Sequence, residues 1–300
     1  MSKLTDLLGK SLRELENTGA AVRIARDLKW AEGPAFISDM GLWIFSDIPN
    51  DRILAYAPSE NTWLFRQPSN FANGQCPLRN GGFLTCEHLT RSVTFTDTDG
   101  KVTVLCDRYK GQRLNSPNDV VQAPDGAVWF SDPTYGIVSD IEGRRAQPEQ
   151  NECRVYRLDL STLELSAEVS GLTMPNGLCF SPSGSLLYVA DSGADMGPNI
   201  PFDPQGPRDV FTFPIDASGR VAGLGSHFCR ITSGVPDGLR CDEYGNLWIA
   251  TAEGIECYDP GGRKIGLIRC HEVASNLAFG GVDDREVCIT TATEAWLVRF

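Results

Sequence analysis

The chain is short of several residue types that would identify common kinds of site. It has only three histidines, its cysteines form no Cys-x-x-Cys pair, and it contains no Gly-x-Ser-x-Gly motif. Zinc sites usually combine closely spaced Cys and His residues, so their absence argues against a zinc-type ligand set. The missing serine motif, together with the absence of a Cys/His pairing, disfavours a nucleophilic serine or cysteine hydrolase.

The sequence also lacks long apolar runs and has fewer basic than acidic residues. A membrane-spanning helix requires roughly 18 or more consecutive apolar residues, and the sequence contains no such run. The chain has 27 Lys and Arg against 39 Asp and Glu, a net charge of −12. Most of this charge fits an acidic, soluble surface, and an acidic cavity that attracts a cation is the sharper alternative. We expect no nucleic-acid partner and no membrane partner.

The ten cysteines and the N-terminal segment bear on the compartment. Residues 1–20 lack the apolar core and cleavage site of a signal peptide. Several cysteines (Cys86, Cys179, Cys288) lie within apolar strands, where cysteine behaves as a small hydrophobic residue. These features predict reduced cysteines and a cytoplasmic protein. The leucines of residues 1–20 recur at helical spacing, which predicts a short amphipathic helix that docks onto a catalytic domain of residues 21–300.

What the sequence does contain is one pattern that occurs six times. A polar residue opens a short apolar strand, a turn follows eight or nine residues later, and a second apolar strand comes next. Successive openings are 41, 45, 58, 61 and 39 residues apart. The opening residues are Glu32, Asn73, Asn118, Asn176, Asp237 and Asn276. Repeats of about 40–50 residues with several strands each are typical of a β-propeller.

We therefore predict an all-β, six-bladed β-propeller with four antiparallel strands per blade. Residues 21–28 alternate between apolar and polar side chains, and we expect them to pair with the last repeat and close the ring. Residues 133–151 and 192–208 do not fit blade strands. Long loops of this kind are usually functional or disordered. Both follow second strands, so they should overhang the face where the six openings converge.

The six opening residues should form a ring, because the innermost strand of every blade lines the central channel. This ring offers two carboxylates and four amides, which are hard oxygen ligands suited to Ca²⁺ or Mg²⁺. Each motif alone would also fit an ordinary turn, but the fixed offset to the hairpin turn favours a site. Asp47, Asp119, Asp132 and Asp191 are weaker candidates. Three of them end second strands, where a turn cap fits equally well.

Six short segments of the repeats carry a recognisable pattern. They are WAEGP at residues 30–34, SPND at 116–119, FSDP at 130–133, PNGL at 175–178, PDG at 236–238 and NLAFGG at 276–281. Together they resemble the gluconolactonase–regucalcin family. The resemblance runs from about Trp30 to the C-terminus, and Cys86-Glu87-His88 is similar to bacterial members in particular. The resemblance implies a six-bladed propeller that hydrolyses sugar lactones with an axial Ca²⁺ or another divalent cation such as Mg²⁺, Mn²⁺ or Zn²⁺.

Carried over residue by residue, the resemblance implies a set of roles. The metal ligands would be Glu32, Asn118, Asn176 and Asp237, with Asp237 also the base. Regucalcin has an arginine two residues before the asparagine of its third repeat, whereas this chain has Ser116 at that place, so substrate contacts should differ there. We expect substrate to be bound by Asn73, His88, Asn276 and Asp119, although His88 could instead pack structurally.

The expected function is divalent-metal-dependent hydrolysis of an aldonolactone such as glucono-1,5-lactone by a monomer or homodimer. Two alternatives stay open. Diisopropyl fluorophosphatase has a similar Glu-Asn-Asn-Asp set, so a phosphotriesterase or fluorophosphatase is one. The other is a non-catalytic calcium-binding propeller, in which the ion only holds the blades together.

Overall fold

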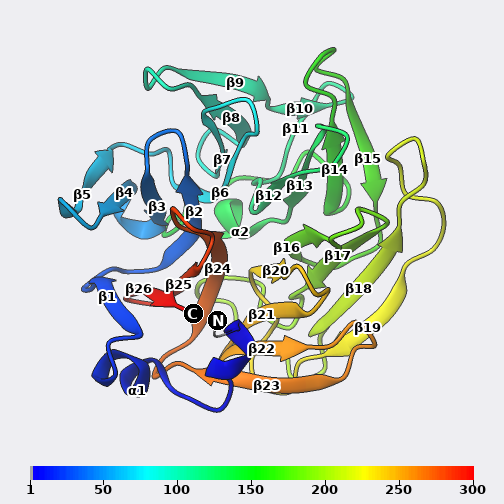
Figure 1. Cartoon of the computed structure of the whole chain (residues 1–300). Coiled ribbons are helices and arrows are strands. Elements are labelled where there is room, and N and C mark those ends of the chain that lie inside the picture. Colours follow the sequence, from blue (N-terminus) through cyan, green and yellow to red (C-terminus); the bar gives the residue numbers. More distant parts are fainter. Residues whose placement is uncertain (1–2) are drawn as a thin grey trace.

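The computed structural model describes residues 3–300 and forms six four-stranded antiparallel sheets arranged around an axis (Figure 1). The predicted architecture, six blades of four strands, is confirmed. None of the helices in residues 3–300 is long and apolar enough to cross a membrane.

Strand bounds follow chain order, with the innermost strand first in each blade. Blade 1 is β2 (Ala31–Ile37), β3 (Leu42–Asp47), β4 (Arg52–Ala57) and β5 (Asn61–Arg66), and blade 2 is β6 (Ala72–Pro77), β7 (Phe83–Glu87), β8 (Ser92–Thr96) and β9 (Val102–Cys106). Blade 3 is β12 (Val120–Gln122), β13 (Val128–Asp132), β14 (Arg154–Leu158) and β15 (Leu165–Val169), and blade 4 is β16 (Pro175–Phe180), β17 (Leu186–Asp191), β18 (Asp209–Pro214) and β19 (Ser226–Arg230). Blade 5 is β20 (Leu239–Cys241), β21 (Leu247–Thr251), β22 (Gly254–Tyr258) and β23 (Lys264–Arg269), and blade 6 is β24 (Ala274–Gly280), β25 (Glu286–Thr291), β26 (Ala295–Arg299) and β1 (Ala21–Ala25).

The apolar core is divided among the junctions between blades. Within residues 3–300, six clusters of buried side chains each join two neighbouring blades. Second strands such as β3 are buried along their whole length, which explains why they read as continuous apolar runs. Large side chains, among them Trp43, Trp129, Trp248 and Trp296, are fully buried in these junctions. Packing between blades therefore fixes the position of each inner strand.

The ring is closed by strands from both ends of the chain. β1 pairs antiparallel with β26, with Ala21 opposite Val298, as predicted. The strand is shorter than residues 21–28, because it ends at Ala25 and Asp27 turns the chain with a φ of 59°. Closure in one blade leaves no open edge between the first and last sheets.

The N-terminal segment forms two short helices where the leucine spacing predicts one. They are η1 (Leu4–Leu7) and α1 (Leu12–Asn17), separated at Gly9, whose φ is +85°. The Gly9 N–H donates to Leu267 O at 2.8 Å, so the break lets the backbone pair with the outer strand β23. Leu4, Leu7, Leu12 and Leu15 pack into the cluster between blades 5 and 6, which confirms the expected docking. Residues 1–2 of this prediction lie outside the described part.

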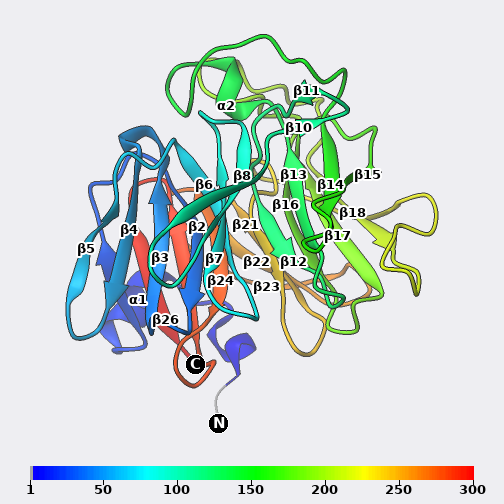
Figure 2. The ribbon, with the colours of Figure 1, turned by 90° about the horizontal axis from the view of Figure 1, so that it is seen from above.

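The two long loops lie on one face of the propeller. Residues 133–151 carry α2 (Tyr135–Val138), which Figure 2 places at the end of the propeller opposite both chain termini. A two-stranded sheet, β10 (Arg108–Tyr109) with β11 (Gln112–Arg113), lies near it. The Tyr135 hydroxyl donates to Asp195 O of the second loop at 3.0 Å. A further helical turn, η2 (Ile48–Asn50), follows β3.

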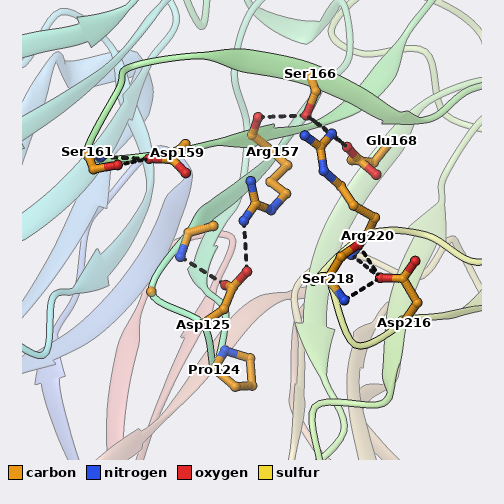
Figure 3. A network of polar contacts seen from close by, with 12 residues as sticks. Pro124, Asp125, Arg157, Asp159, Ser161, Ser166, Glu168, Asp216, Ser218 and Arg220 are labelled. Carbon is orange, nitrogen blue, oxygen red and sulfur yellow. Dashed lines mark hydrogen bonds and ion pairs between the residues drawn. The ribbon is translucent and has the colours of Figure 1, made fainter.

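The outer parts of blades 3 and 4 are joined by polar contacts (Figure 3). Arg220, in the turn after β18, donates to Ser166 of β15 at 2.8 Å and pairs with Glu168 of the same strand. Within blade 3, Arg157 of β14 pairs with Asp125 of the turn between β12 and β13 at 2.8 Å. Because Arg220 and Asp125 are partly exposed, each pair adds roughly 0–1 kcal/mol. The apolar junctions carry most of the stability.

Candidate functional site

A local irregularity marks the start of the inner strand in four blades. The register between first and second strands shifts between Glu32 and Ala35, Ala72 and Gln75, Pro175 and Leu178, and Ala274 and Asn276. An extra residue in one strand bends it and re-aims its side chains. The inner strand is hydrogen-bonded to the second strand on both sides of the bulge. The bulge therefore explains how the opening residue can point its side chain towards the axis.

A glycine follows four of the ring residues because the next blade comes too close for a side chain. A Cβ on Gly74 would lie 2.5 Å from Asn118 O and 2.7 Å from Asp119 Cα. Cβ atoms on Gly33, Gly177 and Gly238 would likewise overlap Asn73, Asp237 and Asn276 of the following blades. The Glu-Gly, Asn-Gly and Asp-Gly pairs in the repeats are therefore packing requirements that bring the ring residues together.

Five of the six ring residues line one cavity of about 320 Å³. They are Glu32, Asn73, Asn118, Asn176 and Asp237. The sixth, Asn276, lies behind this ring: its Nδ2 donates to Glu32 Oε2 at 2.9 Å, and its Oδ1 accepts from Leu277 N at 2.8 Å. Asn276 therefore orients a carboxylate of the cavity and does not contribute to the lining.

The cavity is strongly acidic. Four carboxyl groups line it, from Glu32, Glu142, Asp195 and Asp237, and no Lys, Arg or His is among its lining residues within 3–300. Burial raises the pKa of Glu32 to about 7 and that of Glu142 to about 8. Burial, followed by repulsion from Glu32, raises the pKa of Asp237 well above its ordinary value. Burial has this effect because it disfavours the charged form of a carboxyl group.

This donor set fits a hard divalent cation. Glu32, Asn118, Asn176 and Asp237 come from four different blades, line the same cavity and offer only oxygen ligands apart from their amide NH₂ groups. Two of them are carboxylates, which would balance a charge of +2. The ordinary-turn interpretation does not account for their convergence on one buried cavity.

Two further predicted substrate-binding residues, Asp119 and His88, lie outside the cavity lining, as Asn276 does. The Asp119 carboxylate contacts the Arg240 guanidinium at 3.0 and 3.4 Å. Arg240 lines a separate cavity of about 330 Å³ with Gln75 and Cys76. His88 is buried, and its ring contacts Asn73 and the backbone of Glu142. His88 therefore contacts two residues of the lining without lining the cavity itself, and Asp119 is paired with a residue of the other cavity.

The three other aspartates that the sequence suggested as weaker candidates accept hydrogen bonds from backbone N–H groups. Asp47 accepts from Lys29 N at 2.9 Å, Asp132 from Asn115 N at 2.8 Å, and Asp191 from Met174 N at 2.9 Å. Each donor precedes the inner strand of the same blade. The turn-capping interpretation therefore describes these aspartates, and they support the ring from outside.

The long loops contribute cavity residues that the repeat pattern does not identify. Tyr135 and Glu142 come from residues 133–151, and Asp195 and Ile200 come from residues 192–208. Loop length was the only signal in the sequence. Ser116 holds the first loop in place, since its hydroxyl donates to Pro133 O at 2.7 Å and accepts from Gly136 N at 3.0 Å.

A second group of metal-ligand types, His271, Glu272 and Glu294, lies at blade 6. Its carboxylates already have protein partners: Glu294 binds Arg23 at 2.6 Å and the Trp296 indole N–H at 2.9 Å. The axial cavity is therefore the better metal candidate.

The ten cysteines, all within residues 3–300, are unpaired.

Comparison with known proteins agrees with this geometry. A gluconolactonase of Zymomonas mobilis is 31% identical over 86% of this chain and 75% of its own length. A pentonolactonase of Haloferax volcanii is 26% identical over 87% of this chain and 81% of its own length. The solved structure of a Xanthomonas campestris gluconolactonase superposes with a TM-score of 0.84 at 30% identity, over 93% of this chain and 89% of that one. The model of the SMP-30/gluconolactonase/LRE-like region matches residues 30–293, which include the whole axial ring, and the chain belongs to that family.

Proposed function

We propose that the protein hydrolyses a sugar lactone, an aldonolactone such as glucono-1,5-lactone, to the aldonic acid, with a divalent cation held by Glu32, Asn118, Asn176 and Asp237. The observation that carries this proposal is the acidic cavity, in which oxygen donors from four blades meet and residues 3–300 contribute no basic side chain to the lining. Membership of the family and the names of the relatives support the choice of a lactone. Ca²⁺ suits an all-oxygen site best, and Mg²⁺, Mn²⁺ or Zn²⁺ are the alternatives.

A bound cation would supply Lewis-acid polarisation of the lactone carbonyl and balance the developing negative charge. The chain's own residues supply the rest. Asp237 is the group we assign as general base: its carboxylate takes a proton from the attacking water and returns it to the ring oxygen that leaves. Asn176 lies beside Asp237 in the lining and lowers the pKa of that carboxyl group, which partly offsets the effect of burial. Removing a general base typically slows turnover by about 10²–10⁴-fold.

The walls of the cavity suit a small neutral substrate. Trp30, Ile48, Ile200 and Val235 provide apolar surface around the polar floor. Such surface limits the access of bulk water to the reacting groups. The Asp195 carboxylate in the lining makes an anionic ligand less favourable in the same space. The product of lactone hydrolysis is an anion, so the same repulsion favours its release.

The test is a pH-stat assay on glucono-1,5-lactone, with and without a chelator, run beside a phosphofluoridate substrate. We expect acid release from the lactone that stops on chelation and returns when the cation is added back. A larger rate on the P–F substrate would favour the fluorophosphatase alternative. Cation binding without acid release from either substrate would favour the non-catalytic calcium-binding propeller.

We also propose that the protein acts in the cytoplasm as a monomer or homodimer on a small molecule, without nucleic acid. The ten unpaired cysteines support a reducing compartment. Size-exclusion chromatography with light scattering measures the oligomeric state directly, and a stable trimer or larger assembly would contradict this part of the proposal.

A further inference from the structure

His88 is buried at the end of β7 and has a partner for each ring nitrogen. Its Nδ1 lies 2.8 Å from the backbone oxygen of Glu142, and its Nε2 lies 3.3 Å from Asn73 Nδ2. Gly136 of α2 packs on the other side of the imidazole, because a Cβ at Gly136 would lie 2.5 Å from His88 Cβ and Cγ. The ring is therefore fixed between the inner strand of blade 2 and the loop of residues 133–151.

These contacts determine which ring nitrogen carries the proton. A carbonyl oxygen only accepts hydrogen bonds, so Nδ1 must be the protonated nitrogen. The ring is neutral near pH 7, since burial lowers the pKa of His88 to about 4. Nε2 then carries a lone pair and accepts a hydrogen bond. The Asn73 atom that faces it must be the NH₂ group.

Because the NH₂ group of Asn73 faces His88, the amide oxygen of Asn73 points away from His88. Asn73 is 3% exposed and lines the axial cavity, and Asn73 Oδ1 is buried with no hydrogen-bond partner among residues 3–300. A buried acceptor without a partner is unfavourable, because it has lost its hydrogen bonds to water. A ligand with hydroxyl groups would provide the missing donor.

We propose that His88 is a positioning residue that holds the Asn73 amide with its oxygen free, and that Asn73 Oδ1 accepts a hydrogen bond from a hydroxyl of the bound lactone. The hydroxyl contact rests on the proposed function, whereas the orientation of the amide does not. His88 Nδ1 is hydrogen-bonded to the backbone of Glu142, which belongs to the loop of residues 133–151. The position of this loop therefore affects the orientation of the Asn73 amide. Asn73 Oδ1 is an uncharged acceptor, so it favours a lactone that carries hydroxyl groups without adding charge to the cavity.

The first test is ¹⁵N NMR of the histidine rings in the wild-type protein at pH 7. The chain has three histidines, and His88→Gln identifies the resonances of His88 by their loss. We expect a neutral ring protonated at Nδ1. A ring protonated at Nε2, or at both nitrogens, would overturn the proposal, and this result does not depend on catalysis.

The second test compares glucono-1,5-lactone with δ-valerolactone, which has the same ring without hydroxyl groups. Asn73→Leu should raise KM for the hydroxylated lactone about tenfold, the effect of one lost hydrogen bond, and leave δ-valerolactone within about threefold. His88→Leu should behave like Asn73→Leu. His88→Gln offers one donor and one acceptor and should restore KM to within about threefold of wild type.

Equal losses on both lactones would overturn the hydroxyl contact, and so would failure of His88→Gln to rescue. Circular dichroism and thermal unfolding verify that each variant is folded. If the wild-type protein hydrolyses neither lactone, the proposed function and the hydroxyl contact both fail. The NMR result then decides alone whether His88 orients the amide.

Discussion

Gly74 offers the sharpest test of how the blades bring the site together. A Cβ at this position would lie 2.5 Å from Asn118 O and 2.7 Å from Asp119 Cα, whereas real Cβ atoms essentially never come closer than 3.0 Å. Gly74→Ala must therefore move blade 3 away from blade 2 by about half an ångström to one ångström. Gly74 N also donates to Asn118 O at 2.8 Å, so the displaced backbone belongs to a proposed metal ligand.

The size of the effect follows from this displacement. Overpacking against backbone costs about 1–3 kcal/mol, which should lower Tm by roughly 2–4 °C per kcal/mol in a domain of this size. A misplacement of about 1 Å in a catalytic group can reduce the rate by about 100-fold. We expect Gly74→Ala to lose about 100-fold in kcat/KM and to weaken cation binding, while the protein stays folded at 25 °C.

Gly261→Ala is the matched control. Gly261 lies in the turn between β22 and β23, has no positive φ, and would place its Cβ 3.2 Å from one side-chain oxygen of Asp259. A side chain can move where a backbone cannot, so Tm and kcat/KM should stay close to those of the wild type. Thermal unfolding and steady-state kinetics on both variants decide the matter. Wild-type Tm and activity in Gly74→Ala would refute the packing account of the ring.

Three further predictions concern individual side chains. Asp237→Asn should slow turnover by about 10²–10⁴-fold while largely keeping the cation and the fold; near-normal lactone hydrolysis would reject Asp237 as the base. The lowered pKa of His88, about 4 against an ordinary 6.5, means that its contribution to stability is complete above pH 6.5 and is lost as the pH falls towards 4. That loss amounts to about 3 kcal/mol, so His88→Gln should show a smaller fall in Tm than wild type over this range; parallel Tm–pH curves would contradict the assignment. Arg240→Met leaves the buried Asp119 without its cation and should lower the free energy of unfolding by about 3–5 kcal/mol, which a second change, Asp119→Asn, should largely recover in denaturant titrations. A double variant as unstable as the single one would rule out the ion pair as the cause.

Much of the fold could be predicted because the spacing within each repeat shows where its strands begin and turn. The fixed distance from each opening residue to its hairpin turn located all six inner strands, and the alternation in residues 21–28 located the closing strand. Boundaries set by single backbone conformations could not be predicted in the same way. The left-handed residues Gly9 and Asp27 end a helix and a strand where side-chain periodicity would continue them.

The site was predictable only in part, for a similar reason. Glu32 and Asn276 open their repeats in the same way, yet the first lines the cavity and the second turns its amide to hydrogen-bond the first. Asp119 has the polarity of a site residue, but Arg240, 121 residues away in sequence, pairs with it. Glu142 and Asp195 come from loops without periodicity, where residue type does not indicate which side chain enters the cavity.

The most direct measurement is a calorimetric titration of chelator-treated protein with Ca²⁺. We predict saturable binding of one ion per chain at the axial cavity. Binding should weaken at least about 100-fold in Glu32→Gln/Asp237→Asn, because removing both charges removes the groups that balance the ion. It should be unchanged in Asp216→Asn, which alters an exposed carboxylate in a turn of blade 4. No saturable binding, or equal binding by the double variant and the wild type, would contradict the claim that the ring of oxygen donors is a cation site.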